Sequence, residues 1–395
     1  MSEIAVAPWS VVERLLLAAG AGPAKLQEAV QVAGLDAVAD AIVDELVVRC
    51  DPLSLDESVR IGLEITSGAQ LVRRTVELDH AGLRLAAVAE AAAVLRFDAV
   101  DLLEGLFGPV DGRRHNSREV RWSDSMTQFS PDQGLAGAQR LLAFRNRVST
   151  AVHAVLAAAA TRRADLGALA VRYGSDKWAD LHWYTEHYEH HFSRFQDAPV
   201  RVLEIGIGGY HAPELGGASL RMWQRYFRRG LVYGLDIFEK AGNEGHRVRK
   251  LRGDQSDAEF LEDMAGKIGP FDIVIDDGSH VNDHVKKSFQ SLFPHVRPGG
   301  LYVIEDLQTA YWPGYGGRDG EPAAQRTSID MLKELIDGLH YQERESRCGT
   351  EPSYTERNVA ALHFYHNLVF VEKGLNAEPA APGFVPRQAL GVEGG

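Results

Sequence analysis

The chain has 395 residues, 45% of them hydrophobic, and a formal net charge of −13, which is ordinary for a globular protein of two or three domains. Its negative charge disfavours nucleic acid as a partner, because a negative surface repels phosphate backbones. Two cysteines are too few for a disulfide framework, and neither a signal-like N-terminus nor a membrane-length apolar run is present. We therefore expect a cytoplasmic protein that does not contact a membrane.

Residues 8 to about 106 are predicted to be helical. Apolar residues recur there at the spacing of one helix face, as in Val38, Ile42 and Leu46. This part of the chain is therefore expected to form a mainly helical N-terminal domain.

A polar connection rich in Gly, Asp and Ser follows at residues 108–134, with one short strand expected at Glu119–Trp122. A helix is then predicted from Ala136 to about Arg163. Because the pattern changes after this helix, we place a domain boundary near residue 160. The expected domains are residues 1–160 and residues 161–395.

From about residue 195, predicted strands and helices alternate, which indicates an α/β domain with a parallel sheet covered by helices on both faces. The expected strands are Val200–Ile205, Leu231–Asp236, Val248–Leu251, Phe271–Asp276 and Gly300–Glu305, and the expected helices are Ser219–Phe227, Asp257–Ile268, Asn282–Phe293 and Ser328–Leu339. Two further strands, His363–Tyr365 and Val369–Glu372, flank a short turn. Their spacing predicts an antiparallel hairpin at the end of the sheet.

A glycine-rich turn follows the first of these strands, in the segment V-R-V-L-E-I-G-I-G-G-Y at residues 200–210. Its glycines are Gly206, Gly208 and Gly209. Glycine lets the backbone approach a ligand closely, and the helix that follows contributes a positive dipole end. His211 stands where a dinucleotide fingerprint requires a third glycine, so a nucleotide-dependent oxidoreductase is the weaker alternative.

Carboxylates around this turn indicate a different cofactor. Asp236 ends the next strand, where a carboxylate can hold a ribose. Glu204, just before the glycines, suits the ammonium of an amino-acid moiety and would repel a pyrophosphate. S-adenosylmethionine contains both a ribose and an amino acid. Ser219 is expected as a helix N-cap that could also touch this cofactor.

The loop after the third strand adds two candidates, Asp254 and Gln255. In this fold that loop lies over the far end of the ligand. Either side chain could accept a hydrogen bond from the adenine amino group. The alternative, which the sequence leaves equally open, is an N-cap for the helix that begins near Asp257.

Two neighbouring strands end in acids, Asp276-Asp277 and Glu305-Asp306. The carboxyl ends of parallel strands converge on one crevice, and crowded carboxylates favour a divalent cation. Oxygen ligands are those that Mg²⁺ prefers. We therefore predict Asp277, Glu305 and Asp306 as magnesium ligands, with Asp276 on the opposite side of its strand.

His280 lies three residues after Asp277 and is the candidate general base. A metal ion beside a methyl donor points to an alcohol acceptor, because the cation stabilises the negative charge that develops on the oxygen. A base whose pKa is close to neutral pH then accepts the proton of the alcohol. A structural hydrogen bond is the competing interpretation of this histidine. A non-catalytic ligand-binding or assembly protein is the alternative to an enzyme.

Together these motifs closely resemble the metal-dependent macrolide sugar O-methyltransferases. The resemblance extends from about residue 165 to 373 and rests on H-W-Y-T-E-H-Y-E-H-H-F (182–192), L-E-I-G-I-G-G-Y (203–210), G-L-D-I (234–237), G-D-Q-S-D-A-E-F (253–260), F-D-I-V-I-D-D-G-S-H (271–280), F-P-H-V-R-P-G-G-L-Y-V-I-E-D (293–306) and T-A-Y-W-P-G-Y-G-G (309–317).

The resemblance implies a Rossmann-like S-adenosylmethionine methyltransferase domain with a mostly parallel seven-stranded sheet. It implies methylation of the 2-hydroxyl of a 6-deoxyallose-type sugar on a macrolide, with Mg²⁺ bound by Asp277, Glu305 and Asp306 and with His280 as base. Another glycosylated natural product is the alternative substrate. It also implies a homotetramer in which the N-terminal domains help to complete neighbouring sites.

Three other features of the sequence concern the surroundings of the predicted site. Arg49 could serve such a shared pocket, although a charge facing its own helix end is the simpler interpretation. Tyr184, His187, Tyr188 and His191 share one helix face, which favours a packed aromatic stripe over a metal site. The segment Tyr311–Ala323 follows the metal acids and is typical of a lid.

Overall fold

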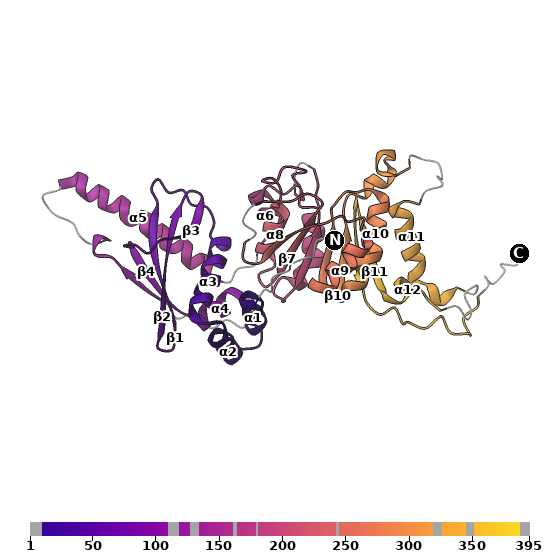
Figure 1. Cartoon of the computed structure of the whole chain (residues 1–395), viewed down its shortest axis with the longest axis horizontal. Coiled ribbons are helices and arrows are strands. Elements are labelled where there is room, and N and C mark those ends of the chain that lie inside the picture. Colours follow the sequence, from indigo (N-terminus) through magenta and orange to yellow (C-terminus); the bar gives the residue numbers. More distant parts are fainter. Residues whose placement is uncertain are drawn as a thin grey trace, which may run out of the picture.

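The computed structural model describes residues 10–109, 118–126, 134–160, 164–178, 181–241, 245–318, 326–344 and 351–387. Within these residues the chain builds two parts, each around its own sheet, and Figure 1 shows them side by side along the long axis of the molecule. Among the described helices, none is long and apolar enough to cross a membrane.

The N-terminal part contains helices, as predicted, and also a five-stranded sheet among its described residues. Its elements are α1 (Ser10–Ala18), α2 (Pro23–Ala33), α3 (Leu35–Arg49), β1 (Val59–Ser67), β2 (Gln70–Asp79), β3 (Gly82–Ala86), β4 (Ala93–Asp98), α4 (Ala99–Phe107), β5 (Arg118–Trp122) and α5 (Gly134–Ala159). The strand order is β3-β2-β1-β4-β5. The strand expected at Glu119–Trp122 is confirmed as β5, and the helix expected from Ala136 is α5.

The helical prediction for residues 59–98 was wrong, because this stretch forms β1 to β4. The sequence carries the strand signal: Val59, Ile61, Leu63 and Ile65 are all buried and follow one another at every second position. This period of two places one row of apolar side chains on a single sheet face. Tight turns at 68–69 and 80–81 then return the chain antiparallel, so β1 pairs with β2 and β2 with β3.

The C-terminal part has the α/β architecture expected from the sequence. Its elements are α6 (Leu166–Tyr173), α7 (Thr185–Phe192), β6 (Arg201–Ile205), α8 (Ala218–Tyr226), β7 (Leu231–Asp236), β8 (Val248–Arg252), α9 (Ala258–Ile268), β9 (Phe271–Asp276), α10 (Asn282–Leu292), β10 (Val296–Ile304), α11 (Ser328–Leu339), α12 (Tyr354–Asn358), β11 (Val359–Tyr365) and β12 (Leu368–Lys373). Its short 3₁₀ helices are η4 (Ser193–Phe195), η5 (Phe293–His295), η6 (Leu307–Tyr311), η7 (Pro313–Tyr315) and η8 (Tyr341–Glu343), and η2 (Asp124–Met126) lies in the N-terminal part.

Seven strands of the described chain form this second sheet, in the order β11-β12-β10-β9-β6-β7-β8. The pairs from β10 to β8 are parallel, and β12 is antiparallel to both β10 and β11, which confirms the predicted hairpin. After β6 the chain proceeds to β7 and β8 on one side and then returns to β9 on the other. Ligands of open α/β sheets bind at such a reversal, outside the carboxyl ends of the strands.

A buried ionic cluster joins the two parts. Glu45 of α3 accepts hydrogen bonds from Arg49 Nε at 2.6 Å and Arg247 Nε at 2.9 Å, and His246 Nε2 lies 2.8 Å away. Burial raises the pKa of Glu45, but Arg247 and Arg49 outweigh it and hold the pKa well below its usual range. Arg49 is only 3% exposed, so it serves this cluster and does not face outward to a neighbouring subunit.

Candidate active site

The glycine turn begins directly after β6 and is closely packed against the loop after β9. Gly206 has φ +93°, and a Cβ at this position would lie 2.0 Å from the carbonyl oxygen of Asp277. Gly208 and Gly209 also have positive φ, and a Cβ on Gly209 would lie 2.4 Å from the backbone of Leu215. Glycine is therefore required by the backbone conformation and by the close approach of neighbouring chain.

Asp236 ends β7 and supports this turn. Its Oδ2 accepts a hydrogen bond from the backbone N–H of Ile207 at 3.0 Å, and its Oδ1 accepts one from Phe238 at 2.9 Å. The carboxylate is half-buried at the edge of the turn. Both oxygens thus order backbone next to the expected ribose position, and the ribose contact itself stays a prediction.

Glu204 is fully buried at the end of β6. Ser219 donates from Oγ to Glu204 Oε2 at 2.7 Å, and burial raises the pKa of Glu204 to about 7 against the opposing effect of Lys177. The N-cap of α8 is Gly217, with no side-chain cap bond, so the prediction that Ser219 caps this helix was wrong. Its hydroxyl instead orients the acid.

Gln255 is buried, and both the nitrogen and the oxygen of its side-chain amide form hydrogen bonds within the protein. Nε2 donates to Asp276 Oδ1 at 3.0 Å, and Oε1 accepts from the backbone N–H of Ser279 at 2.6 Å. Gln255 therefore ties the end of β9 to the loop that carries His280, and its adenine contact stays a prediction.

Asp254 is half-buried beside it. Its Oδ1 accepts from the backbone N–H of Ser256 at 2.7 Å, and Asp257 is the residue that caps α9. The capping alternative is therefore wrong for Asp254 and Gln255. The adenine contact of Asp254 stays a prediction.

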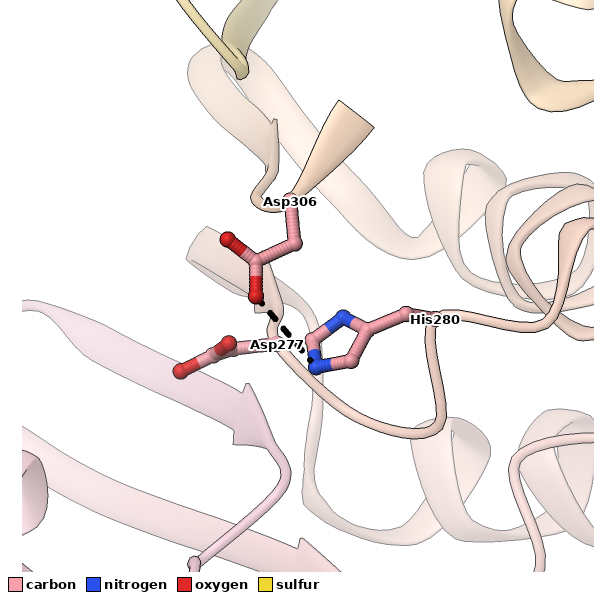
Figure 2. A group of neighbouring side chains, drawn as sticks. All are labelled: Asp277, His280 and Asp306. Atoms are coloured by element: carbon pink, nitrogen blue, oxygen red, sulfur yellow. Dashed lines mark ion pairs between the residues drawn. The ribbon is translucent and has the colours of Figure 1, made fainter. Parts of the chain in front are cut away.

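Asp277, His280 and Asp306 converge at the carboxyl ends of β9 and β10 (Figure 2). One ligand atom from each lies within 4.8 Å of the others, and His280 Nε2 is 3.5 Å from Asp306 Oδ2. The three side chains are 22%, 23% and 15% exposed, so the group opens to solvent. His280 and Asp306 both have positive φ, +56° and +55°, a conformation that side-chain-bearing residues adopt at a cost and that is common at functional sites.

Glu305 lies next to this group but faces another partner. Lys177 Nζ donates to its Oε1 at 2.7 Å, and the Tyr188 hydroxyl donates to the same oxygen. Asp276 is buried on the other side of β9, where Ser288 and Tyr302 donate to it, which confirms the predicted orientation. Of the three predicted metal ligands, two share the open group with His280, and the third points toward a lysine.

Lys177, which the sequence analysis did not single out, lies at the centre of the buried acids. Its Nζ is 2.7 Å from Asp277 Oδ2, 2.7 Å from Glu305 Oε1 and 3.5 Å from Glu204 Oε1. Burial lowers the pKa of Lys177, but these three carboxylates outweigh it and raise the pKa well above its usual range. The surrounding carboxylates therefore favour the charged ammonium form of this side chain.

Aromatic side chains on and just before α7 contact Glu305 and Asp306. Tyr184 and Tyr188 are buried, and His187 and His191 pack on Tyr365, which confirms the packed stripe. The tyrosine hydroxyls have a further role that the sequence analysis missed. Tyr184 donates to Asp306 Oδ1 at 3.1 Å, as Tyr188 does to Glu305. The four-residue spacing of the two tyrosines, one helical turn, was the available signal.

Exposed aromatic side chains lie just beyond Asp306. Tyr311 and Trp312, in and after η6, are 57% and 48% exposed. The predicted lid, Tyr311–Ala323, begins at the last residue of η6 and contains η7, and its residues 319–323 lie outside the described residues. Its closure stays a prediction.

Comparison with known proteins gives consistent matches along the chain. Residues 12–118 match the family model "MycE methyltransferase N-terminal", and residues 125–307 match "Methyltransferase domain". Demethylmacrocin O-methyltransferase of Streptomyces fradiae is 43% identical, over 96% of this chain and 95% of its own. The 8-demethyl-8-(2-methoxy-alpha-L-rhamnosyl)-tetracenomycin-C 3'-O-methyltransferase of Streptomyces olivaceus is 42% identical, over 90% of each.

A solved structure extends this likeness to the fold. The MycE methyltransferase in complex with Mg, SAH and mycinamycin VI superposes with a TM-score of 0.86 at 40% identity, covering 97% of this chain and 98% of that one. The likeness therefore includes both sheets and the helices between them.

Proposed function

The chain belongs to the MycE family of O-methyltransferases, and from this premise we propose that it methylates a sugar hydroxyl of a glycosylated macrolide. Its cofactors are S-adenosylmethionine as methyl donor and Mg²⁺. We assign the acceptor as the 2-hydroxyl of a 6-deoxyallose-type sugar, as the sequence resemblance implies. The observation that carries the proposal is the convergence of Asp277, His280 and Asp306 on one open group.

The donor set suits Mg²⁺. Asp277 and Asp306 supply carboxylate oxygens in a partly open position, and Mg²⁺ binds through a few carboxylates while keeping other positions for water or substrate. We retain Glu305 as the third ligand. Lys177 and Tyr188 both donate to its Oε1, so its other oxygen would be the one that remains to hold the ion.

The glycine turn fits S-adenosylmethionine. The turn lies where the strand order reverses, and Asp236 orders it from the side assigned to the ribose. Glu204 is fully buried, so we propose that it acts on the cofactor without direct contact. Its negative charge favours the ammonium of the cofactor, and its carboxylate orients the Ser219 hydroxyl. Asp254 is assigned to the adenine, and Gln255 becomes a residue that positions the His280 loop.

The reaction follows from these positions. Mg²⁺ supplies positive charge that makes a sugar hydroxyl more acidic. His280 accepts the hydroxyl proton, and the oxygen attacks the methyl carbon of the sulfonium. The new O–C bond forms as the C–S bond breaks, the electron pair stays on sulfur, and S-adenosylhomocysteine is released. Holding donor and acceptor in line supplies much of the rate.

The test is methyl transfer from ¹³C-methyl-labelled S-adenosylmethionine to a panel of desmethyl acceptors. The panel contains macrolides with a 6-deoxyallose-type sugar and a rhamnosylated tetracenomycin, and NMR locates the label. We expect the label on the 2-oxygen of the deoxyallose, and no transfer in excess EDTA. Label on the rhamnose alone would assign the chain to another glycosylated natural product, since one relative acts on that class. Transfer to none of the acceptors would refute the proposal.

We also propose a homotetramer and a domain division near residue 160. The division falls between the end of α5 at Ala159 and the start of α6 at Leu166. Light scattering coupled to size exclusion measures the oligomer directly, and a mass of about four chains is expected. A monomer that is fully active would contradict shared sites.

A further inference from the structure

The ammonium of Lys177 occupies a position that would otherwise suit a metal ion. Glu204, Asp277 and Glu305 end three adjacent strands and bring oxygens within 4.8 Å of one another. Lys177 Nζ lies among them, at 2.7 Å from two and 3.5 Å from the third, and the side chain is 0% exposed. Two buried carboxylates and the half-buried Asp277 would repel one another strongly with no cation among them.

The lysine reaches this position from outside the sheet. It lies in the segment between α6 and α7, where its carbonyl accepts a hydrogen bond from the backbone N–H of Tyr184 at 3.0 Å. This bond fixes the segment against the start of α7, where Tyr184 donates to Asp306 and Tyr188 donates to Glu305. Lys177 is thus fixed at its backbone by the bond from Tyr184 and at its ammonium by the three carboxylates.

Asp277 belongs to two adjacent cation positions. Its Oδ2 faces Lys177 in the closed group with Glu204 and Glu305, and it is also part of the open group with His280 and Asp306. The two groups differ in access, because Glu204 and Glu305 are at most 1% exposed whereas Asp277 and Asp306 are 22% and 15% exposed. One position is closed by a covalently attached cation, and the other remains open.

We propose that Lys177 is a positioning residue that serves as the fixed cation of a two-cation site. It holds Asp277 Oδ2 and Glu305 Oε1 in place before any metal binds, and it keeps exchangeable metal out of the position between Glu204, Asp277 and Glu305, so that metal binds on the side of Asp306. The inference deepens the proposed function and rests on it for the identity of that open site. Removing the ammonium should let a second divalent ion enter the closed group.

The experiment counts metal ions in the full-length protein. Mn²⁺ is titrated into wild type, Lys177→Met and Lys177→Arg with S-adenosylhomocysteine present, and free Mn²⁺ is measured by EPR. We expect one ion per chain for wild type and for Lys177→Arg, which keeps the charge. For Lys177→Met, which keeps the length and loses the charge, we expect two ions and a larger Mn²⁺-induced rise in Tm than wild type.

A purely structural lysine would lower Tm without changing the stoichiometry, so one ion for Lys177→Met with the wild-type Tm shift overturns the proposal. Lys177→Gln is the second neutral variant. If both neutral variants fold only with Mn²⁺, the proposal is supported, and if neither folds with or without it, the proposal is overturned. If wild type binds no ion, the proposed metal function fails, while one additional ion in Lys177→Met still supports the role of Lys177.

Discussion

Replacing Gln255 by leucine tests whether this side chain positions His280 or contacts the cofactor. The substitution keeps the approximate volume and removes both amide bonds, one to Asp276 and one to the backbone of Ser279. Asp276 keeps Ser288 and Tyr302 as donors, so its carboxylate is not left unpaired. The effect should therefore fall on the loop from Asp277 to His280.

The size of the effect follows from the two bonds. A hydrogen bond to a charged group contributes about 1.5–3 kcal/mol and a neutral one about 0.5–1.5 kcal/mol. The positive φ of His280 adds strain that the loop must be held against. If about 2 kcal/mol of the loss falls on the placement of His280, kcat decreases about 30-fold, since each 1.4 kcal/mol is roughly a factor of ten.

Two measurements separate the hypotheses. We expect Gln255→Leu to lower kcat while the Kd of S-adenosylhomocysteine, from calorimetry, stays within about threefold of wild type (about 0.7 kcal/mol). Gln290→Leu, the same change at an exposed position on α10, is the matched control and should retain both values. An adenine contact would give the opposite pattern, with weaker cofactor binding and a nearly normal kcat at saturation, and that result would refute the positioning argument.

Three further changes have defined outcomes. His280→Ala should lose most of kcat and keep Mg²⁺ affinity, whereas His80→Ala in the β2–β3 turn should match wild type; a normal rate for His280→Ala excludes it as the base. Glu45→Gln should lower the free energy of unfolding in urea by about 3–5 kcal/mol, because Arg247 is left buried without its counter-charge. Because the pKa of Glu45 is lowered in the folded state, its stabilisation is present above the unfolded pKa of about 4.3 and is lost as pH falls through the folded pKa. The free energy of unfolding of Glu45→Gln should therefore decrease less in acid than that of wild type. An equal decrease in both proteins contradicts the assignment. Gly206→Ala should abolish S-adenosylhomocysteine binding, since its Cβ would lie 2.0 Å from the Asp277 carbonyl, and retained binding by calorimetry argues against the turn.

The α/β part was predictable because its strands are short apolar runs separated by helices with a clear period. Five parallel strands and the terminal hairpin lie within a few residues of their expected bounds. The N-terminal sheet was not predicted because the helical spacing of Val38, Ile42 and Leu46 does not continue into residues 59–98, which form strands. In β1, alternation of Val59, Ile61 and Leu63 with Arg60 was the decisive signal, since a period of two fits a strand and not a helix.

The site was predictable where strand order alone decides proximity. Asp277 and Asp306 end adjacent parallel strands, and His280 follows on the same loop, so all three had to meet. Lys177 could not be found in this way, because it lies between two helices and reaches the acids only through tertiary packing. Gln255 shows a second limit: its place in the chain indicates nearness to the cofactor, but the direction of its amide depends on the loop beyond Asp276.

The cofactor turn and the metal loop behave as one structural unit because the sheet continues past the ends of its strands. Gly206 N–H donates to Leu235 O at 2.7 Å, Asp277 N–H to Ile205 O at 2.9 Å, and Glu305 N–H to Asp276 O at 3.0 Å. Each bond links the first residue after one strand to its neighbour. A displacement of the turn would therefore be passed to Asp277 and then to Glu305. A methyl donor on the turn and a metal on Asp277 and Glu305, as proposed, would be fixed relative to each other by backbone, which would leave the sugar as the partner to be oriented between them.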